Sequence, residues 1–123
     1  MALPHAQPLD VVSVRALGPQ LRQAVSTSLL RTDRLQLLHL VLPMYEDLPQ
    51  HWVDDTCVLH CLEGQVEVAL PSGLRRLQAG ELVVLPPAQA HALRARADSA
   101  ILMTLLHHGE ADATGGPGAP PGA

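Results

Sequence analysis

The sequence predicts an all-β fold, a sandwich or barrel built from short strands in one domain. From Cys57 onward, apolar runs rich in Val, Leu and Ile end at turn residues about every 8–12 positions. Residues 65–70, Gln-Val-Glu-Val-Ala-Leu, alternate apolar and polar side chains, which is typical of a half-buried strand. Helical patterns of about 10–15 residues between the strands are missing, so repeated βαβ units are not expected.

Size and composition agree with a single domain and narrow the possible partners. The chain has 123 residues, of which 47% are hydrophobic, and this fraction is enough to form a core. Phe is absent and aromatic residues make up 2%, so aliphatic side chains must fill that core. The net charge is −4 with only eight Lys and Arg residues, which argues against a nucleic-acid partner.

The first quarter of the chain predicts an arm followed by two strands. Residues 1–25 are assigned to an N-terminal arm and first element, with a weakly indicated helical turn near Gln20–Ala24 after Gly18-Pro19. Two strands then meet near Thr32-Asp33, and the second extends from Leu35 to Leu42, where Pro43 stops it. That second strand is apolar on both faces, as expected for a strand that is covered on both sides.

The remaining strands complete a barrel that we place at residues 26–106. Turns are predicted at Gly64, at Pro71–Gly73, at Ala79–Glu81, at Pro86-Pro87 and at Asp98-Ser99. Residues 107–123 contain mainly Gly, Pro and Ala without apolar periodicity and are assigned to a flexible tail. The pair His107-His108 is interpreted as a solvated strand end in preference to a metal site.

Targeting signals and cysteine usage favour a cytoplasmic protein. The N-terminus has no basic start followed by an apolar run, so no signal peptide is evident. A membrane helix needs about 20 apolar residues, and no stretch approaches that length. The two cysteines, Cys57 and Cys61, lie about 13 Å apart along a strand, too far for the roughly 7 Å that a disulfide allows. We expect both to stay reduced.

Two segments carry a family resemblance. Residues 45–64 contain His51 and a closing Gly64, and residues 80–95 contain Gly80, Pro86 and His91 at matching intervals. These positions resemble the two motifs of the cupin family, which forms double-stranded β-barrels of the jelly-roll type. The resemblance spans residues 26–106 in strand order and turns, and it implies a small single-domain bacterial cupin with a cupin-like barrel fold.

The departures from the family pattern bear on metal binding. Tyr45 and Ala88 stand where the family has glycines, and Ala95 stands at an asparagine. Val53 stands at the second histidine of the first motif, and Cys57 stands at its glutamate. Cupins that bind metal typically use three histidines and that glutamate. The resemblance therefore implies a depleted metal site of His51 and His91, with Cys57 as a third donor if it ionises.

Each candidate residue has two interpretations. Cys57 is either a thiolate ligand suited to zinc or copper or a small apolar core residue, as free cysteine often is. His51 and His91 are either pocket residues or structural hydrogen-bond partners. Trp52 and Tyr45, the only aromatic side chains near His51, either line a ligand pocket or pack at a rim or interface. His39 is interpreted as a core histidine and is the remaining candidate for a missing ligand.

Two functional classes follow, and a third is weaker. The first is a small-molecule-binding domain of unknown ligand with the ligand-binding residues His51, His91, Trp52 and Tyr45. The second is a metal-dependent enzyme, an oxygenase or isomerase by family analogy, using a divalent Zn, Cu, Fe, Ni or Mn ion at His51, His91 and Cys57. A structural interaction module would instead predict a filled barrel. Catalytic residues cannot be assigned. We expect a homodimer, because the first strand leaves a sheet edge that a partner could cover.

Overall fold

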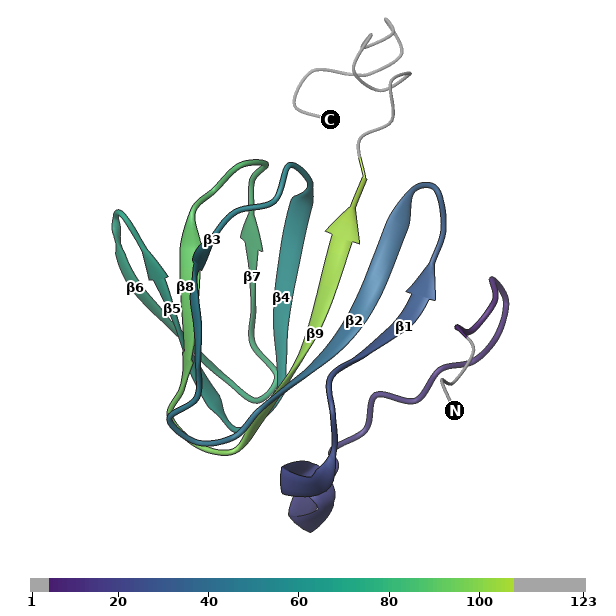
Figure 1. Ribbon diagram of the computed structural model, residues 1–123, viewed down its shortest axis with the longest axis horizontal. Coiled ribbons are helices and arrows are strands. Elements are labelled where there is room, and N and C mark those ends of the chain that lie inside the picture. The colour runs from purple at the N-terminus through teal and green to yellow at the C-terminus, as the bar shows by residue number, and fades with distance from the viewer. Residues whose placement is uncertain (1–4, 108–123) are drawn as a thin grey trace, which may run out of the picture.

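The computed structural model describes residues 5–107 and consists of two β-sheets facing each other (Figure 1). One short 3₁₀ helix precedes nine strands. Their bounds in chain order are η1 Gly18–Gln23, β1 Thr27–Arg31, β2 Leu35–Leu42, β3 Asp47–His51, β4 Thr56–Glu63, β5 Gln65–Leu70, β6 Gly73–Gln78, β7 Leu82–Leu85, β8 His91–Ala95 and β9 Ser99–Leu106. The predicted all-β, cupin-like jelly roll is confirmed. Most of the predicted tail, residues 108–123, lies outside the described residues.

The topology places strands from distant parts of the chain side by side. A five-stranded sheet has the order β1-β2-β9-β4-β7, and a four-stranded sheet has the order β3-β8-β5-β6. Every pairing between these strands is antiparallel, so each sheet can present one face to the core and the other to its surroundings. The last strand, β9, is central in the five-stranded sheet (Figure 1).

The core forms where the inner faces of the two sheets meet. It is aliphatic, as the lack of Phe requires, with alternate residues of each strand pointing inward. Cys57, Leu59 and Cys61 of β4 are at most 1% exposed, and Val66 and Val68 of β5 are fully buried. The predicted alternation of residues 65–70 and the predicted common face of the two cysteines are both confirmed.

A smaller apolar cluster attaches the N-terminal segment to the outside of the barrel. Leu21 of η1 packs with Val41 of β2 and Ala100 of β9. Glu63 accepts hydrogen bonds from the backbone N–H groups of Leu17 and Gly18, at 2.7 and 3.2 Å. The weakly indicated helical turn near Gln20–Ala24 is therefore a 3₁₀ helix that starts two residues earlier.

The edge of β1 is partly covered by the chain itself. Ala6 forms an isolated parallel bridge with Leu30, and its N–H donates to the carbonyl of Leu29 at 2.9 Å. The ring of His5 lies 2.7 Å from the hydroxyl of Ser28. The N-terminal arm thus occupies part of the edge at which we expected a partner strand.

One strand, β3, has no clear sequence signal. Its sequence Asp-Leu-Pro-Gln-His contains a proline and only one aliphatic residue. Proline is tolerated in a sheet mainly at an edge, where its missing N–H costs no hydrogen bond. Strand β3 is the edge of the four-stranded sheet, next to β8, and its pairing is irregular between Leu48 and His51.

The backbone supports the motif register inferred from the sequence. Tyr45 and Ala88, which occupy the two family glycine positions, both adopt positive φ angles, 68° and 63°. Residues other than glycine rarely adopt this left-handed conformation. Both positions thus adopt a backbone conformation that favours glycine.

Candidate functional site

The two motif histidines lie together where β3 ends and β8 begins. His51 is the last residue of β3 and pairs in register with His91, the first residue of β8. Their ring centroids are 4.4 Å apart, with the ring planes at 56°. His91 is 1% exposed, whereas His51 is partly exposed. The structure thus brings His51 and His91 into one site, although they are 40 positions apart in the sequence.

Both rings are held by the same backbone arrangement. The Nδ1 atom of His51 lies 3.0 Å from the carbonyl oxygen of Pro49, and that of His91 lies 3.0 Å from the carbonyl oxygen of Gln89. A carbonyl only accepts hydrogen bonds, so each Nδ1 must carry the proton and donate it. In the neutral ring, Nε2 then carries a lone pair. This orientation by a carbonyl on the other nitrogen is the one found in metal-ligating histidines.

The Nε2 atom of His91 is buried and has no hydrogen-bond partner among residues 5–107. Burial lowers the pKa of this ring below its ordinary 6.5, while the bond to Gln89 raises it and the neighbouring His51 lowers it. The ring is therefore neutral near pH 7, and its Nε2 can accept a hydrogen bond or bind a cation. An unpaired buried acceptor lowers the stability of the fold by about 1–3 kcal/mol, and a ligand that donates a hydrogen bond to it would recover this free energy.

Cys57 lies in the aliphatic core and is 1% exposed. Burial raises the pKa of its thiol from 9.0 to about 11, and the charge of Asp55 acts in the same direction. Across residues 5–107, no group of three or more His, Cys, Asp or Glu side chains is placed to hold a metal ion. Val53 packs against the same core, and its carbonyl accepts from the N–H of Ala88 at 2.7 Å.

The two aromatic candidates differ in position. Trp52 follows His51 directly and is 63% exposed, so it lies at the same end of the barrel as the histidines. Tyr45 precedes β3, and its N–H donates to the carbonyl of Ala95, the last residue of β8. About six residues of extended chain, roughly 15–20 Å, therefore separate Tyr45 from His51. The structure does not bring Tyr45 to the histidine pair.

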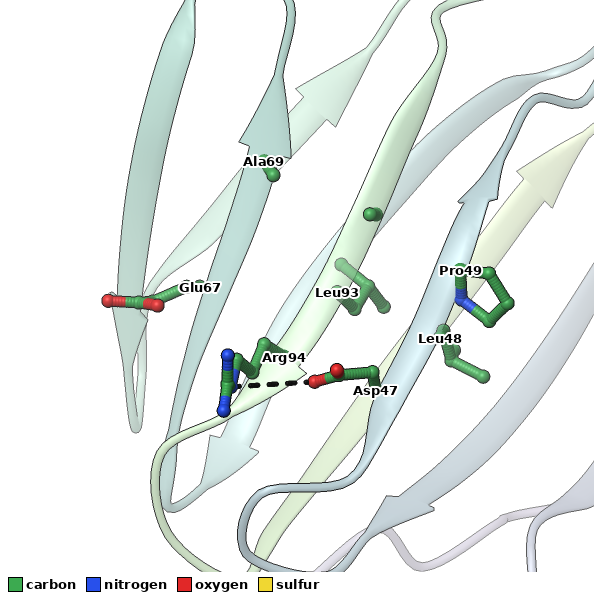
Figure 2. Close-up of a pocket in the computed structure, with 8 residues that line it drawn as sticks. Asp47, Leu48, Pro49, Glu67, Ala69, Leu93 and Arg94 are labelled. Carbon is green, nitrogen blue, oxygen red and sulfur yellow. Dashed lines mark ion pairs between the residues drawn. The ribbon is translucent and has the colours of Figure 1, made fainter.

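A shallow hollow of about 240 Å³ lies on the outer face of the four-stranded sheet (Figure 2). Ala69 and Ala92 are among its lining residues. Arg94 reaches across to Asp47, with 3.5 Å between Nε and Oδ1 (Figure 2). Alternation along β8 turns Ala92 and Arg94 away from the core, opposite to His91 and Leu93. The hollow is thus separate from the histidine site. Its charged side chains form ion pairs, Arg94 with Asp47 and Glu67 with Arg76.

A second histidine with a buried, unpartnered Nε2 is His39 on β2. Burial lowers its pKa, and the charge of Glu63 raises it. On β2 the core-facing residues include Leu38 and Leu40, so His39 points to the other face of the five-stranded sheet. His39 therefore does not supply a missing ligand to the His51–His91 site.

Sequence reasoning missed the backbone carbonyls of Pro49 and Gln89, which orient the two rings. Carbonyl groups leave no side-chain signature, and the only hint is that each lies two residues before its histidine.

No helix among residues 5–107 has the length and apolar character that a membrane span requires.

Comparisons with known proteins identify the family. A family profile described as AraC-like ligand binding domain matches residues 39–116. None of the curated proteins matches the sequence. Among solved structures, a conserved protein of unknown function from Streptococcus pyogenes has a TM-score of 0.66 and 19% identity, over 86% of this chain and 96% of that one.

Two further structures share the fold. A cupin superfamily protein from Desulfitobacterium hafniense has a TM-score of 0.65 and 19% identity, over 85% of this chain and 94% of that one. A cupin-2 domain containing protein from Shewanella frigidimarina has a TM-score of 0.59 and 20% identity, over 67% and 79%. At these identities the likeness concerns the fold alone. With the family profile covering more than half of its length, the chain belongs to the AraC-like ligand-binding domain family, as a small member of the cupin superfamily.

Proposed function

We propose that this domain binds a small, uncharged molecule through His51 and His91, without performing chemistry on it. The observation that carries the proposal is the buried Nε2 of His91, which has no partner among residues 5–107 and lies beside the second backbone-oriented histidine. Two adjacent Nε2 acceptors suit a ligand with hydroxyl or amide N–H donors. A carboxylate would meet a neutral His91 that has no proton on Nε2 to donate.

Burial differs between the two rings, and this suggests how a ligand would bind. Partly exposed His51 lets a molecule approach from solvent, while buried His91 provides the desolvated contact. Hydrogen bonds made away from water discriminate more strongly between ligands than exposed ones. In this proposal Trp52 lies beside the entrance, and Tyr45 has no role in the site.

A thermal-shift screen tests the proposal. Neutral polyols and amides should include compounds that raise the Tm of the wild-type protein, whereas matched carboxylates should have no effect. The variants His51→Ala and His91→Ala should lose the shift. His39→Ala is the matched control, because it removes the other buried, unpartnered imidazole on the opposite face of its sheet. Equal loss in His39→Ala, or a shift that survives in His91→Ala, would contradict the proposal.

Trp52 gives an independent readout because it is the only tryptophan in the chain. Its indole is exposed, so its emission reports the polarity of the surroundings. We expect a compound that raises the Tm to change that emission as well. Unchanged emission on saturation would show that Trp52 lies away from the ligand.

A second candidate function is a metal-dependent enzyme, and the carbonyl-oriented ring pair favours it specifically. His51 and His91 fit as two ligands of a divalent Zn, Cu, Fe, Ni or Mn ion, and such an ion would supply Lewis-acid polarisation of a bound oxygen. Catalytic sites usually have three protein ligands, however, and Cys57 is protonated near neutral pH. The donor set therefore supports weak, exchangeable metal binding.

Dialysis against a mild chelator separates the two candidates. We expect the metal to be lost, His51→Ala and His91→Ala to abolish residual binding, and Cys57→Ala to change it little. The variant Val53→His restores the family's second histidine and should tighten Zn²⁺ binding at least about tenfold by calorimetry, or about 1.4 kcal/mol. Stoichiometric metal that survives dialysis and disappears in Cys57→Ala would favour the enzyme.

A further inference from the structure

The outer face of the four-stranded sheet has a row of alternating charges. The strand register aligns Asp47 of β3, Arg94 of β8, Glu67 of β5 and Arg76 of β6 across the sheet. The distance from Nε to the carboxylate oxygen is 3.5 Å for Arg94 with Asp47 and 3.3 Å for Arg76 with Glu67. The two signs of charge balance within this row, although the whole chain has a net charge of −4.

An apolar row lies beside the charged row. Alternation along a strand places residues two positions apart on the same face, about 7 Å from each other. On β3, β8 and β5 these residues are Pro49, Ala92 and Ala69, and the two alanines pair with each other. All three line the hollow of about 240 Å³ together with side chains of the charged row (Figure 2). The hollow therefore joins an apolar surface to an ion pair.

Arg94 has hydrogen-bonding capacity that the protein does not use. Its guanidinium carries several N–H donors in a planar fork that matches a carboxylate. The 3.5 Å contact with Asp47 is longer than the roughly 2.7–2.9 Å of a strong charge-assisted hydrogen bond. Within residues 5–107, the guanidinium of Arg94 donates no hydrogen bond. The side chains of Arg94 and Asp47 are 53% and 58% exposed, so a ligand in solution can reach both.

The other ion pair of the row is less available. The side chain of Glu67 is only 12% exposed, and its carboxylate contacts Arg76. Arg76 belongs to the charged row but is not among the residues that line the hollow. The pair Arg94–Asp47 therefore supplies the accessible charges of the hollow.

We propose that this hollow binds a small zwitterion, an α-amino acid with an aliphatic side chain. The ligand's carboxylate accepts hydrogen bonds from the guanidinium of Arg94, and its ammonium group donates to the carboxylate of Asp47. Its aliphatic side chain covers the methyl groups of Ala69 and Ala92. The loose ion pair opens to receive the ligand, and each protein charge then still has an opposite charge beside it.

Size favours this class of ligand. Pockets for drug-sized molecules have volumes of about 300 Å³ or more, so a hollow of about 240 Å³ suits a smaller molecule. The separation of about 7 Å between the charged and the apolar row requires charged groups and an apolar group only a few bonds apart. An α-amino acid has this arrangement.

Charge favours a zwitterion over a simple ion. A ligand with a carboxylate alone would pair with Arg94 but bring a like charge next to Asp47. A ligand with an ammonium group alone would bring a like charge next to Arg94. A zwitterion avoids both repulsions. Because the contacts are exposed to solvent, each contributes little, and we expect a Kd of about 1–10 mM.

This site is independent of the one proposed at His51 and His91. Ala92 follows His91 in the sequence, but the side chains of neighbouring strand residues point to opposite faces of the sheet. A ligand in the hollow is therefore separated from the histidine rings by the sheet itself. Substitution of His91 should leave binding in the hollow unchanged.

Titration of the isotope-labelled full chain with leucine, followed by amide NMR spectra, tests the proposal. We expect saturable shifts at the amides of Ala69 and Ala92. Arg94→Gln removes the fork and Ala92→Leu fills the hollow, and each should weaken binding at least about fivefold. Arg76→Gln is the matched control, because it removes the other arginine of the row and should leave the Kd unchanged.

Two analogues of leucine test the zwitterion directly. Isocaproate lacks the ammonium group, and isoamylamine lacks the carboxylate. Each should bind at least about fivefold more weakly than leucine, because one protein charge then faces no opposite charge on the ligand. Equal binding of either analogue would overturn the assignment of a zwitterion.

Circular dichroism first establishes that each variant is folded, and Ala69→Val replaces Ala92→Leu if the latter loses structure. The absence of saturable shifts up to about 50 mM leucine overturns the proposal. Shifts that persist with the same Kd in the folded Arg94 and alanine variants also overturn it. Loss of the shifts in His91→Ala does so too, since leucine would then occupy the histidine site.

Discussion

The two segments that contribute the histidines, residues 45–64 and 80–95, accommodate their left-handed backbone positions in different ways. Gly64 has φ of 84°, and a Cβ atom there would lie 2.7 Å from the Cα of Ser99, with Ser99 Oγ and Asp98 O also in contact. Gly80 has φ of 91°, yet an added Cβ would meet nothing within 4 Å. At Gly64 a larger residue is disfavoured both by the lack of space and by the left-handed backbone. At Gly80 only the backbone conformation disfavours it.

This difference shows how each segment is attached to the barrel. The turn at Gly64 packs on the first residue of β9, so the first segment is fastened directly to the central strand. The turns of the second segment lie at the surface, and Ala88 there adopts φ of 63° with its side chain exposed. The more buried histidine, His91, nevertheless belongs to the second segment. Burial of the ligand group and crowding of the turns are thus independent features of the two segments.

The difference between the two segments can be tested most directly at Gly64. Gly64→Ala should destabilise the fold by about 2–5 kcal/mol, because a left-handed alanine costs about 1–2 kcal/mol and overpacking adds about 1–3 kcal/mol. Gly80→Ala is the matched control and should cost only the conformational part. Urea unfolding monitored by circular dichroism measures both changes. Equal losses in the two variants would show that crowding at Ser99 is not important.

A smaller effect concerns His91 and pH. Burial lowers its folded pKa below the 6.5 of an unfolded histidine. Between those two values the unfolded state binds more protons, so stability is complete above about pH 6.5 and falls as the pH drops toward the folded pKa. His39 shifts in the same direction through burial, so it contributes to the same loss.

Tm values at about pH 7.5 and about pH 5 check this expectation. The wild type should lose more stability on acidification than His91→Gln, and the double variant His39→Gln/His91→Gln should lose least. His91, in the second segment, would then account for part of the stability that is lost at low pH. An identical acid loss in the wild type and in the double variant would rule out both rings as its source.

The smallest expected change is at Ala88. Ala88→Gly relieves the left-handed strain but gives the unfolded chain more freedom, so the net gain is about 0.5 kcal/mol. Tyr45→Gly makes the corresponding change in the first segment, where φ is 68°. Because the two positions do not share contacts, their effects should add in the double variant. Destabilisation by Ala88→Gly in urea titrations would mean that the alanine side chain contributes packing.

Much of the fold could be predicted because strand period and turn residues are local signals. Residues 65–70 alternate in the sequence and in the structure, and each turn predicted after Cys57 separates two strands. Strand β3 was missed because Pro49 and its polar neighbours give it almost no β propensity, and it forms through pairing with β8. Its existence depends on a contact between residues about 40 positions apart.

The site could be predicted only in part for a similar reason. The intervals between motif residues predicted that His51 and His91 share one site, and the structure places the two rings together. The same intervals put Tyr45 near His51 in the sequence, but an extended strand carries the two to opposite ends of β3. The orientation of the rings depends on backbone carbonyl groups, and the protonation state of Cys57 depends on its burial. Neither can be inferred from residue types alone.

The position of β9 affects how the protein can be made in the cell. This strand comes last in the described chain, and yet it lies between β2 and β4 and pairs with both. Strands β2 and β4 therefore cannot be joined into one sheet until β9 has left the ribosome. Until then, both have open edges with apolar side chains, which are the features that promote aggregation. The five-stranded sheet can therefore be completed only after β9 has been synthesised, and a chain truncated before β9 should be prone to aggregation.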